Sequence, residues 1–341
     1  MVKVAIGYHI QTGPWGGGNA FARSLRDHIL SIGGSVVHTL DDKNIDIILM
    51  TDPRGFSPQV SFHAGSIIRH VLFKNPNALV VHRINECDER KGTKNMNRLL
   101  RAANYAADHT VFIGSWLKKL RVWRAGSPNS TILNGADGRI FNRAKYVPWN
   151  GEEKLRLVTH HWGGNSLKGS DVYRRLDAML GSSHWKKRVS FTFIGNVPAD
   201  LRLLNTRVLP PMNAHQLAKE ISKHHVYLTG SQNEPAGMHH IEGALCGLPL
   251  IFRNSGALPE YCEGFGLPFQ KLKEFEPSLE RMLVEYQFFK NKMIAYPHTA
   301  EKMCAAYVDL FDRLLIDRKQ IVSNRRLFSE PWSLLRNQFP H

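Results

Sequence analysis

The chain has 341 residues, which is long enough for two domains that each have a core of their own. Its 43% hydrophobic and 22% charged residues are typical of a soluble globular protein, and no apolar run has the length of a membrane span. The formal net charge of +16 favours anionic partners: nucleic acid, anionic lipid or phosphorylated substrates. Because the sequence contains no block of about five or six like charges, we do not expect nucleic acid as a partner.

The cysteines and the amino-terminal sequence bear on the compartment. The four cysteines have neither the spacing of metal ligands nor a paired arrangement, which indicates a reduced protein. The chain enters a strand directly after Met1, without the cleavage pattern of a secretory signal. We therefore expect a cytoplasmic protein. Its positive charge permits a peripheral contact with an anionic membrane.

The first predicted elements are a buried strand at 2–7, a glycine-rich turn at 11–19 and an amphipathic helix at 20–32. Glycines between a first strand and a first helix let the backbone approach a ligand, often a phosphate. The spacing is neither that of a dinucleotide-binding loop nor that of a P-loop. By itself, the glycine cluster is equally consistent with a tight turn and with a binding loop.

Strands and helices then alternate through the rest of the first half. Strands are predicted at 45–50, 79–84 and 110–113, and helices near 60–73, 96–107 and 116–123. This alternation predicts an open parallel sheet with helices on both faces and with ligands at the carboxyl ends of its strands. The polar segment 82–92 lies at one of those strand ends, and a histidine in such a position is more often a hydrogen-bonded structural residue.

The second half repeats the pattern after a polar, proline-bearing linker at 144–153. It contains predicted strands at 155–160, 189–194, 226–229 and 248–252, with helices between them and two further helices at about 276–292 and 297–318. We therefore predict an α/β protein with two doubly wound domains. The tail at 325–341 has no assignment.

Two glutamates stand out between the last two of these strands. Glu234 lies at a loop–helix junction, and Glu242 lies eight residues further on, about two helical turns away. The amino end of the helix favours an anion, and the second carboxylate can accept hydrogen bonds from a polyol. A phosphate beside a sugar hydroxyl is the ligand that this arrangement suggests. The alternative is a solvated helix face with no binding role.

The whole segment 233–250, NEPAGMHHIEGALCGLPL, resembles the donor-sugar motif of retaining GT-B glycosyltransferases of the family 4 type. Other segments that resemble this family are the glycine-rich turn at 16–18, 108–115, 131–141, Lys168-Gly169 and 255–269. The resemblance implies two Rossmann-like domains that face an interdomain cleft. They are an acceptor-side domain at 1–145 and a nucleotide-sugar domain at 152–310, with 311–341 packing back toward the first.

The resemblance also implies roles for individual residues. Glu234 is expected at the sugar ring and reaction centre, Glu242 at the ribose hydroxyls, and Lys168 at the leaving diphosphate, where preorganised charge stabilises the transition state. His82 is expected to approach the transferred sugar as a third catalytic residue. Further donor-binding candidates are Gly17, Gly18, Asn165, Gly237, Met238 and His239, and acceptor-side candidates are Asp88 and Trp15.

One position departs from the family pattern. An arginine usually precedes the lysine by about five residues as a second clamp on the diphosphate, but Gly163 and Gly164 occupy that region here. Asn165, His160 or His161 would have to replace it.

The activity that the resemblance implies is a retaining, hexosyl-transferring reaction. A UDP- or GDP-sugar would be the donor, and a glycan or lipid-linked hydroxyl the acceptor. No Asp-x-Asp sequence occurs, and we expect neither a metal nor another cofactor. The alternatives are a nucleotide-sugar epimerase, another GT-B enzyme, or a degenerate GT-B protein that only binds nucleotides or polyanions.

Overall fold

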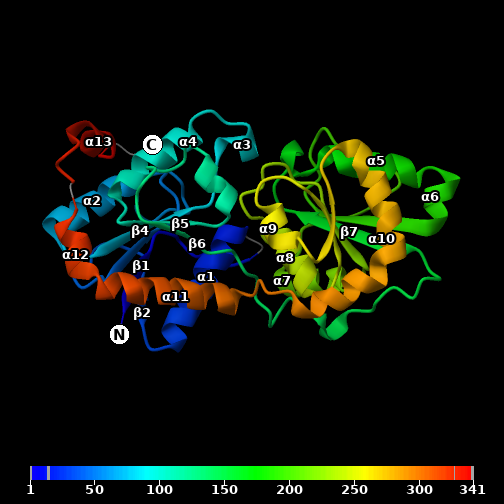
Figure 1. Cartoon of the computed structure of the whole chain (residues 1–341), viewed down its shortest axis with the longest axis horizontal. Coiled ribbons are helices and arrows are strands. Elements are labelled where there is room, and N and C mark those ends of the chain that lie inside the picture. Colours follow the sequence, from blue (N-terminus) through cyan, green and yellow to red (C-terminus); the bar gives the residue numbers. More distant parts are fainter. Residues whose placement is uncertain (1, 14–15, 326, 339–341) are drawn as a thin grey trace. The chain divides into compact units, whose positions relative to one another are not determined.

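The computed structural model describes residues 2–13, 16–325 and 327–338, and within them it contains two six-stranded sheets in two compact units (Figure 1). The first unit consists of the chain up to Thr12, Gly17–Asn134 and the chain from Ala300 onward. The second consists mainly of Gly135–Thr299. All pairings between neighbouring strands of both sheets are parallel.

The sheet of the first unit has the order β2-β1-β3-β4-β5-β6. Its strands are β1 (Lys3–Ile6), β2 (Ser35–Val37), β3 (Ile47–Met50), β4 (Leu79–Ile84), β5 (His109–Phe112) and β6 (Asn129–Thr131). Strand β3 is a continuous apolar run because helices cover both of its faces and leave it no solvent side. The strand order reverses between β1 and β3, which makes their carboxyl ends a topological switch point.

Helices cover both faces of this sheet. Those that precede the last strand are α1 (Gly17–Ser31), α2 (Ala64–Phe73), α3 (Asp88–Lys91), α4 (Met96–Ala103) and the 3-10 segments η1 (Asn104–Ala106) and η2 (Ser115–Lys119). One face packs α1 against the sheet through residues such as Phe21 and Leu25, and the other packs α2 through Ile67 and Ile68. The unit therefore has two apolar layers, one on each side of the strands.

The last part of the chain packs on this first unit. It forms α11 (Ala300–Ile316), α12 (Arg318–Ser323) and α13 (Pro331–Arg336). Helix α11 lies beside α1, where the ring centroids of Phe21 and Tyr307 are 5.2 Å apart. Further on, Arg325 forms an ion pair with Asp108 at 2.6 Å, and Leu327 is buried among the residues of the α2 face. The tail that the sequence left unassigned is thus fastened by specific contacts.

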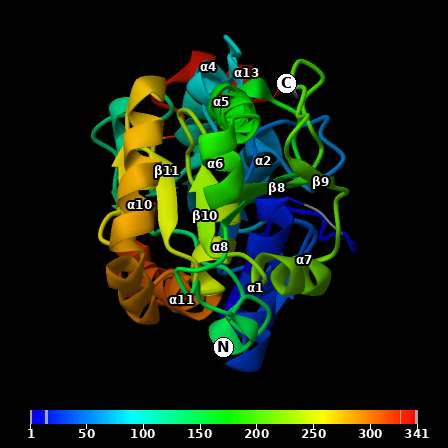
Figure 2. The same cartoon turned by 90° about the vertical axis from the view of Figure 1, so that its right-hand side faces the viewer.

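The sheet of the second unit has the order β12-β11-β10-β7-β8-β9, with its switch point between β7 and β10. Its strands are β7 (Leu155–His161), β8 (Val189–Gly195), β9 (Arg207–Leu209), β10 (Val226–Thr229), β11 (Leu250–Arg253) and β12 (Gly266–Phe269). Its helices are α5 (Ser170–Leu180), α6 (Ser183–Arg188), α7 (Ala214–Ile221), α8 (Met238–Leu245), α9 (Leu258–Cys262) and α10 (Leu272–Lys292), with 3-10 segments η3 (Arg143–Lys145), η4 (Ser166–Lys168) and η5 (Met293–Ala295). Helix α10 packs on β11 and β12 (Figure 2), and α8 packs on β7 and β10.

These two sheets confirm the predicted fold class, with some differences in detail. The helix expected at 116–123 is the short 3-10 segment η2, after which the chain turns back and the ring of Trp123 packs on Phe112. The three-residue edge strands β2 and β9 were not predicted. The segment expected as a linker, 144–153, begins in η3 and is part of the second unit, where the hydroxyls of Tyr146 and Tyr286 lie 2.5 Å apart. No helix in the described ranges combines the length and the apolar composition that a bilayer crossing needs.

Candidate functional site

The predicted motif lies at the switch point of the second unit, where the chain leaves β10 and enters α8. The loop between them includes Asn233, which has a φ of 49°, and Glu234. A tight turn holds both residues: Ser255 Oγ accepts a hydrogen bond from the Asn233 N–H, and the Ala257 N–H donates to the Glu234 carbonyl. A Cβ on Gly256 would lie 2.4 Å from that carbonyl oxygen, so glycine lets the turn press against Glu234.

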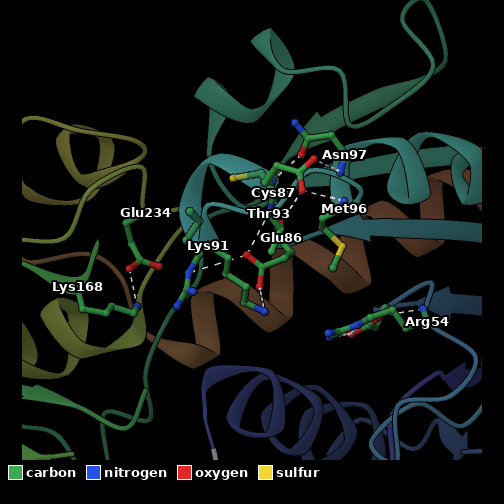
Figure 3. A network of polar contacts seen from close by, with 12 residues as sticks. Arg54, Glu86, Cys87, Lys91, Thr93, Met96, Asn97, Lys168 and Glu234 are labelled. Carbon is green, nitrogen blue, oxygen red and sulfur yellow. Dashed lines mark hydrogen bonds and ion pairs between the residues drawn. The ribbon is translucent and has the colours of Figure 1, made fainter. Parts of the chain in front are cut away.

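Lys168, from η4, forms an ion pair with Glu234 of this loop. The distance from Lys168 Nζ to Glu234 Oε2 is 2.6 Å, and their side chains are 13% and 4% exposed (Figure 3). Lys168 ends η4 and is followed by Gly169, which has a φ of 107°. A Cβ on Gly169 would lie 2.7 Å from Gly230 Cα, so two glycines let the η4 loop and the β10 loop touch. The backbone therefore fixes an ammonium group beside a nearly buried carboxylate.

Glu242 is held by a histidine and a tyrosine. Its Oε2 lies 2.7 Å from His160 Nε2, and the hydroxyl of Tyr227 lies 3.0 Å from His160 Nδ1. The same hydroxyl accepts the His160 backbone N–H at 3.0 Å, so its own proton points to Nδ1. This network assigns the tautomer in which Nε2 carries the proton and donates it to Glu242. Burial raises the pKa of Tyr227 well above its usual value, which keeps the hydroxyl protonated.

Helix α8 supplies an anion-binding end to the same site. The N-cap of this helix is Gly237, which has no side chain to bond the first N–H groups. Met238 begins the helix, and the N–H groups of its first turn point along the axis. His239 lies directly under that end: a Cβ on Gly237 would be 2.3 Å from its ring, and its Nε2 lies 2.8 Å from Thr229 Oγ1. Burial, helped by the nearby His161, lowers the pKa of His239 well below its usual value. The ring is therefore neutral.

Several polar side chains lie near Gly163 and Gly164, where the family pattern has an arginine. Asn165 caps η4, because its Oδ1 accepts the Leu167 N–H at 2.8 Å. His161 Nε2 lies 2.7 Å from the hydroxyl of Tyr173. Sequence reasoning missed Arg253, which donates to the Gly230 carbonyl at 2.9 Å and pairs with Asp171 at 2.5 Å. The second unit thus brings a buried guanidinium to the β10 loop from the end of β11.

The candidates of the first unit occupy different surroundings. His82 is 0% exposed in the middle of β4, and its Nδ1 lies 3.1 Å from Asn104 Nδ2. Burial lowers its pKa to about 3, so the ring is neutral and enclosed by the protein. Gly17 and Gly18 begin α1, next to Asn19, whose side chain makes two hydrogen bonds to the backbone of Gln11. Trp15 lies outside the described residues.

Asp88 begins α3, and its carboxylate holds the turn into α4 through Thr93, Met96 and Asn97, which are labelled in Figure 3. It accepts hydrogen bonds from Thr93 Oγ1 at 2.6 Å and from the N–H groups of Met96 and Asn97 at 2.8 and 3.0 Å. Burial by itself raises the pKa of Asp88, but these hydrogen bonds outweigh it and lower that pKa. Sequence reasoning missed the neighbouring pair in which Lys91 Nζ lies 2.7 Å from Glu86 Oε2. No signal marked it, since Glu86 was one of several polar residues in the segment.

Two of the residues that sequence reasoning missed share one property. Tyr227 and Arg253 lie inside apolar strand sequences, where an aromatic or long side chain is expected to fill the core. Only the pairing of β7 with β10 brings the Tyr227 hydroxyl to His160, 67 residues away along the chain. Among the described residues, no group of three or more His, Cys, Asp or Glu side chains has an arrangement that could hold a metal ion.

At the level of sequence, no protein-family model and no curated protein matches the chain. Solved structures do match it. Sucrose-phosphate synthase from Thermosynechococcus elongatus is 13% identical, and the match has a TM-score of 0.64 and covers 93% of this chain and 100% of that one. HepE from Anabaena, in complex with UDP and glucose, is 10% identical with a TM-score of 0.62, over 92% of this chain and 100% of that one.

A third similar structure is the pneumococcal O-GlcNAc transferase GtfA in complex with UDP and GlcNAc. It is 13% identical, with a TM-score of 0.60 over 85% of this chain and 60% of that one. At identities this low, the structural matches show a shared fold alone. Together with the two switch-point sheets, these matches confirm the fold that the motif resemblance implied: this chain has the GT-B glycosyltransferase fold.

Proposed function

We propose that this protein is a retaining glycosyltransferase that moves a sugar from a nucleotide-diphosphate sugar to a hydroxyl of a glycan or lipid-linked acceptor. One observation carries the proposal: the Lys168–Glu234 pair and the Glu242–His160 pair both lie at the switch point between β7 and β10. Open α/β sheets bind nucleotides at such points. Similar structures with bound UDP support a UDP-sugar rather than a GDP-sugar as donor.

Glu242 is proposed to bind the ribose of the donor. His160 donates to Oε2 of Glu242, and among the described residues no hydrogen bond is found to Oε1, so this second oxygen can accept from a ligand. A carboxylate held in this way is preorganised to accept hydrogen bonds from two vicinal hydroxyls. This ribose-binding role depends on the orientation that Tyr227 and His160 impose on Glu242. We therefore expect the affinity for the nucleotide to depend on those two side chains.

Lys168 and the amino end of α8 are proposed to stabilise the leaving diphosphate. The ammonium group carries three donors, so it can bond a phosphate oxygen while it still contacts Glu234. Glu234 then lies where it can accept hydrogen bonds from the transferred sugar. Preorganised donors of this kind act where charge develops, and loss of one typically lowers the rate by about a hundredfold or more. We propose that this cationic environment replaces a metal, and the motif resemblance supports retention.

The test begins with binding. Thermal unfolding with UDP or GDP reports the nucleotide, because a ligand at 100 times its Kd adds about 2.7 kcal/mol of stability. A labelled sugar nucleotide then reports the reaction: a glycosylated acceptor supports the proposal. An isomerised donor in the absence of acceptor identifies an epimerase instead, and failure to bind either nucleotide contradicts both.

Two variants separate the roles of the glutamates. Glu234→Ala is expected to lose turnover while it still binds the nucleotide diphosphate, and Glu242→Ala is expected to lose affinity for it. The exposed Glu263→Ala, in the same unit, is the matched control and should behave like the wild type. Equal and negligible effects of the first two variants would contradict the proposed assignment.

A further inference from the structure

A cavity lies in the first unit, between α4, the loop at Arg124 and α13. Its volume is about 550 Å³. The side chains with formal charge that line it are Arg98, Arg101, Arg124, Glu330 and Arg336. Helices α4 and α13 lie side by side in both views of the molecule (Figures 1 and 2). All lining residues belong to the same unit, so its own fold forms the cavity.

The charges of this cavity are unbalanced. Glu330 is paired with Arg124 through two hydrogen bonds, one of them 2.9 Å from Arg124 Nη1 to Oε2. Across residues 2–13, 16–325 and 327–338, no carboxylate pairs with Arg98, Arg101 or Arg336. Four guanidinium groups against one carboxylate therefore leave an excess of three positive charges around one hollow. Like charges that line one cavity repel one another, and a bound anion would relieve that repulsion.

Specific contacts hold the carboxyl-terminal segment that forms one wall of the cavity. Asn337 is buried, and its Nδ2 donates to the carbonyl of Ala102 in α4 at 3.0 Å. A Cβ on Gly65 in α2 would lie 2.1 Å from the Asn337 carbonyl oxygen, so the end of α13 is pressed onto that helix. Upstream, the hydroxyl of Tyr105 donates to the Leu327 carbonyl at 2.6 Å. The position of Arg336 relative to α4 therefore follows from packing on both sides.

The cavity lies at the amino ends of strands β5 and β6 of the first unit, and substrates of open α/β sheets bind at the other ends of the strands. Helix α4 ends just before β5, and the loop at Arg124 precedes β6. The Arg124 N–H donates to Asn104 Oδ1 at 2.9 Å, which ties the two segments together at the amino ends of these strands. Ligands of open α/β sheets bind outside the carboxyl ends. None of the residues that line the cavity is among the groups that carry the proposed function, so the cavity can bind a ligand whether or not that function holds.

We propose that this cavity binds a phosphate group. A guanidinium group can donate two parallel hydrogen bonds to the oxygens of one phosphate. Arg98 and Arg101 lie three residues apart on one helix, so they present two guanidinium groups from the same face. The volume lies in the range of small-molecule sites and accommodates a phosphate with a polar group attached. The phosphate belongs either to a soluble phosphorylated compound or to a phospholipid head group. Helix α13 also exposes Trp332, at 84%, and Leu335, which an acyl chain would contact.

The test compares the wild type with Arg98→Gln/Arg101→Gln and with Arg336→Gln. The matched control is Lys186→Gln/Lys187→Gln, which removes two positive charges from exposed positions of α6 in the second unit. Inorganic pyrophosphate is titrated by calorimetry, and binding to vesicles of phosphatidylcholine with and without an anionic phospholipid is measured by sedimentation. Circular dichroism confirms that each variant is folded.

We expect the Arg98→Gln/Arg101→Gln variant to bind at least about tenfold more weakly and Arg336→Gln to weaken binding in the same direction, while the lysine control binds like the wild type. Loss of pyrophosphate binding identifies a soluble phosphate compound as the ligand, and loss of vesicle binding alone identifies a lipid head group. Pyrophosphate bound elsewhere would respond equally in all variants. Such an equal response, or no binding of either probe by the wild type, would overturn the proposal.

Discussion

The chain of hydrogen bonds from Tyr227 through His160 to Glu242 makes a sharp prediction. In Tyr227→Phe, the buried N–H of His160 loses its acceptor, which destabilises the fold by about 1–3 kcal/mol. His160 Nδ1 also loses the donor that fixes the proton on Nε2. Glu242 is then no longer oriented toward the ribose. Loss of about 1.4 kcal/mol of preorganisation raises the Kd of the nucleotide diphosphate about tenfold.

Calorimetric titration with UDP measures this affinity, and urea unfolding measures the stability. The matched control is Tyr286→Phe, which removes a buried hydroxyl that bonds Tyr146 and the Trp149 N–H in the same unit. It should lower the stability by a similar amount and leave the Kd unchanged. If Tyr227→Phe unfolds more easily but binds UDP as tightly as the wild type, the proposed orientation of Glu242 is refuted.

Three further predictions concern the same unit. Lys168→Met leaves Glu234 nearly buried without its ammonium partner, so we expect a loss of about 3–5 kcal/mol in urea unfolding and at least about a hundredfold lower turnover in the transferase assay. Gly169→Ala places a Cβ 2.7 Å from Gly230 at a φ of 107° and should destabilise the fold by more than about 2 kcal/mol, whereas Gly164→Ala, whose Cβ meets nothing closer than 4.0 Å, should unfold like the wild type. Burial lowers the pKa of His240 to about 3, below its unfolded value of about 6.5, so the stability that this residue contributes is complete above pH 6.5 and falls as the pH drops toward 3. His240→Leu should therefore lose about 1.4 kcal/mol less than the wild type between pH 7.5 and 5.5, and identical pH profiles in urea unfolding would contradict this explanation.

The histidines of the second unit illustrate how the fold prepares a site. The ring of His239 contacts the rings of His160, His161 and His240. Burial keeps His239 and His240 neutral, so they contribute hydrogen-bonding capacity and shape without adding charge beside Lys168. The cationic side chains at the β10 loop are therefore Lys168 and Arg253, and we expect a diphosphate to meet the lysine.

Local sequence was sufficient for much of the fold. The apolar runs 226–229 and 248–252 and the spacing of Glu234 and Glu242 were readable because each depends on neighbours within a few residues. Their alternation with helices predicted parallel sheets, and the structure contains them. The short edge strands β2 and β9 were missed because a half-exposed run of three residues has no distinct periodicity.

What the sequence by itself determined is the fold class, since composition, periodicity and turn chemistry are local properties; the site residues that it suggested stay predictions. Only the tertiary structure decided what those residues touch. Strand pairing at the switch point joined Tyr227 and His160 to Glu242, and the contact of Gly169 with Gly230 set Lys168 against Glu234. Packing also enclosed His82 within its strand and brought Arg336 to Arg98, more than two hundred residues apart. Such contacts depend on how distant segments pack, and no local pattern encodes them.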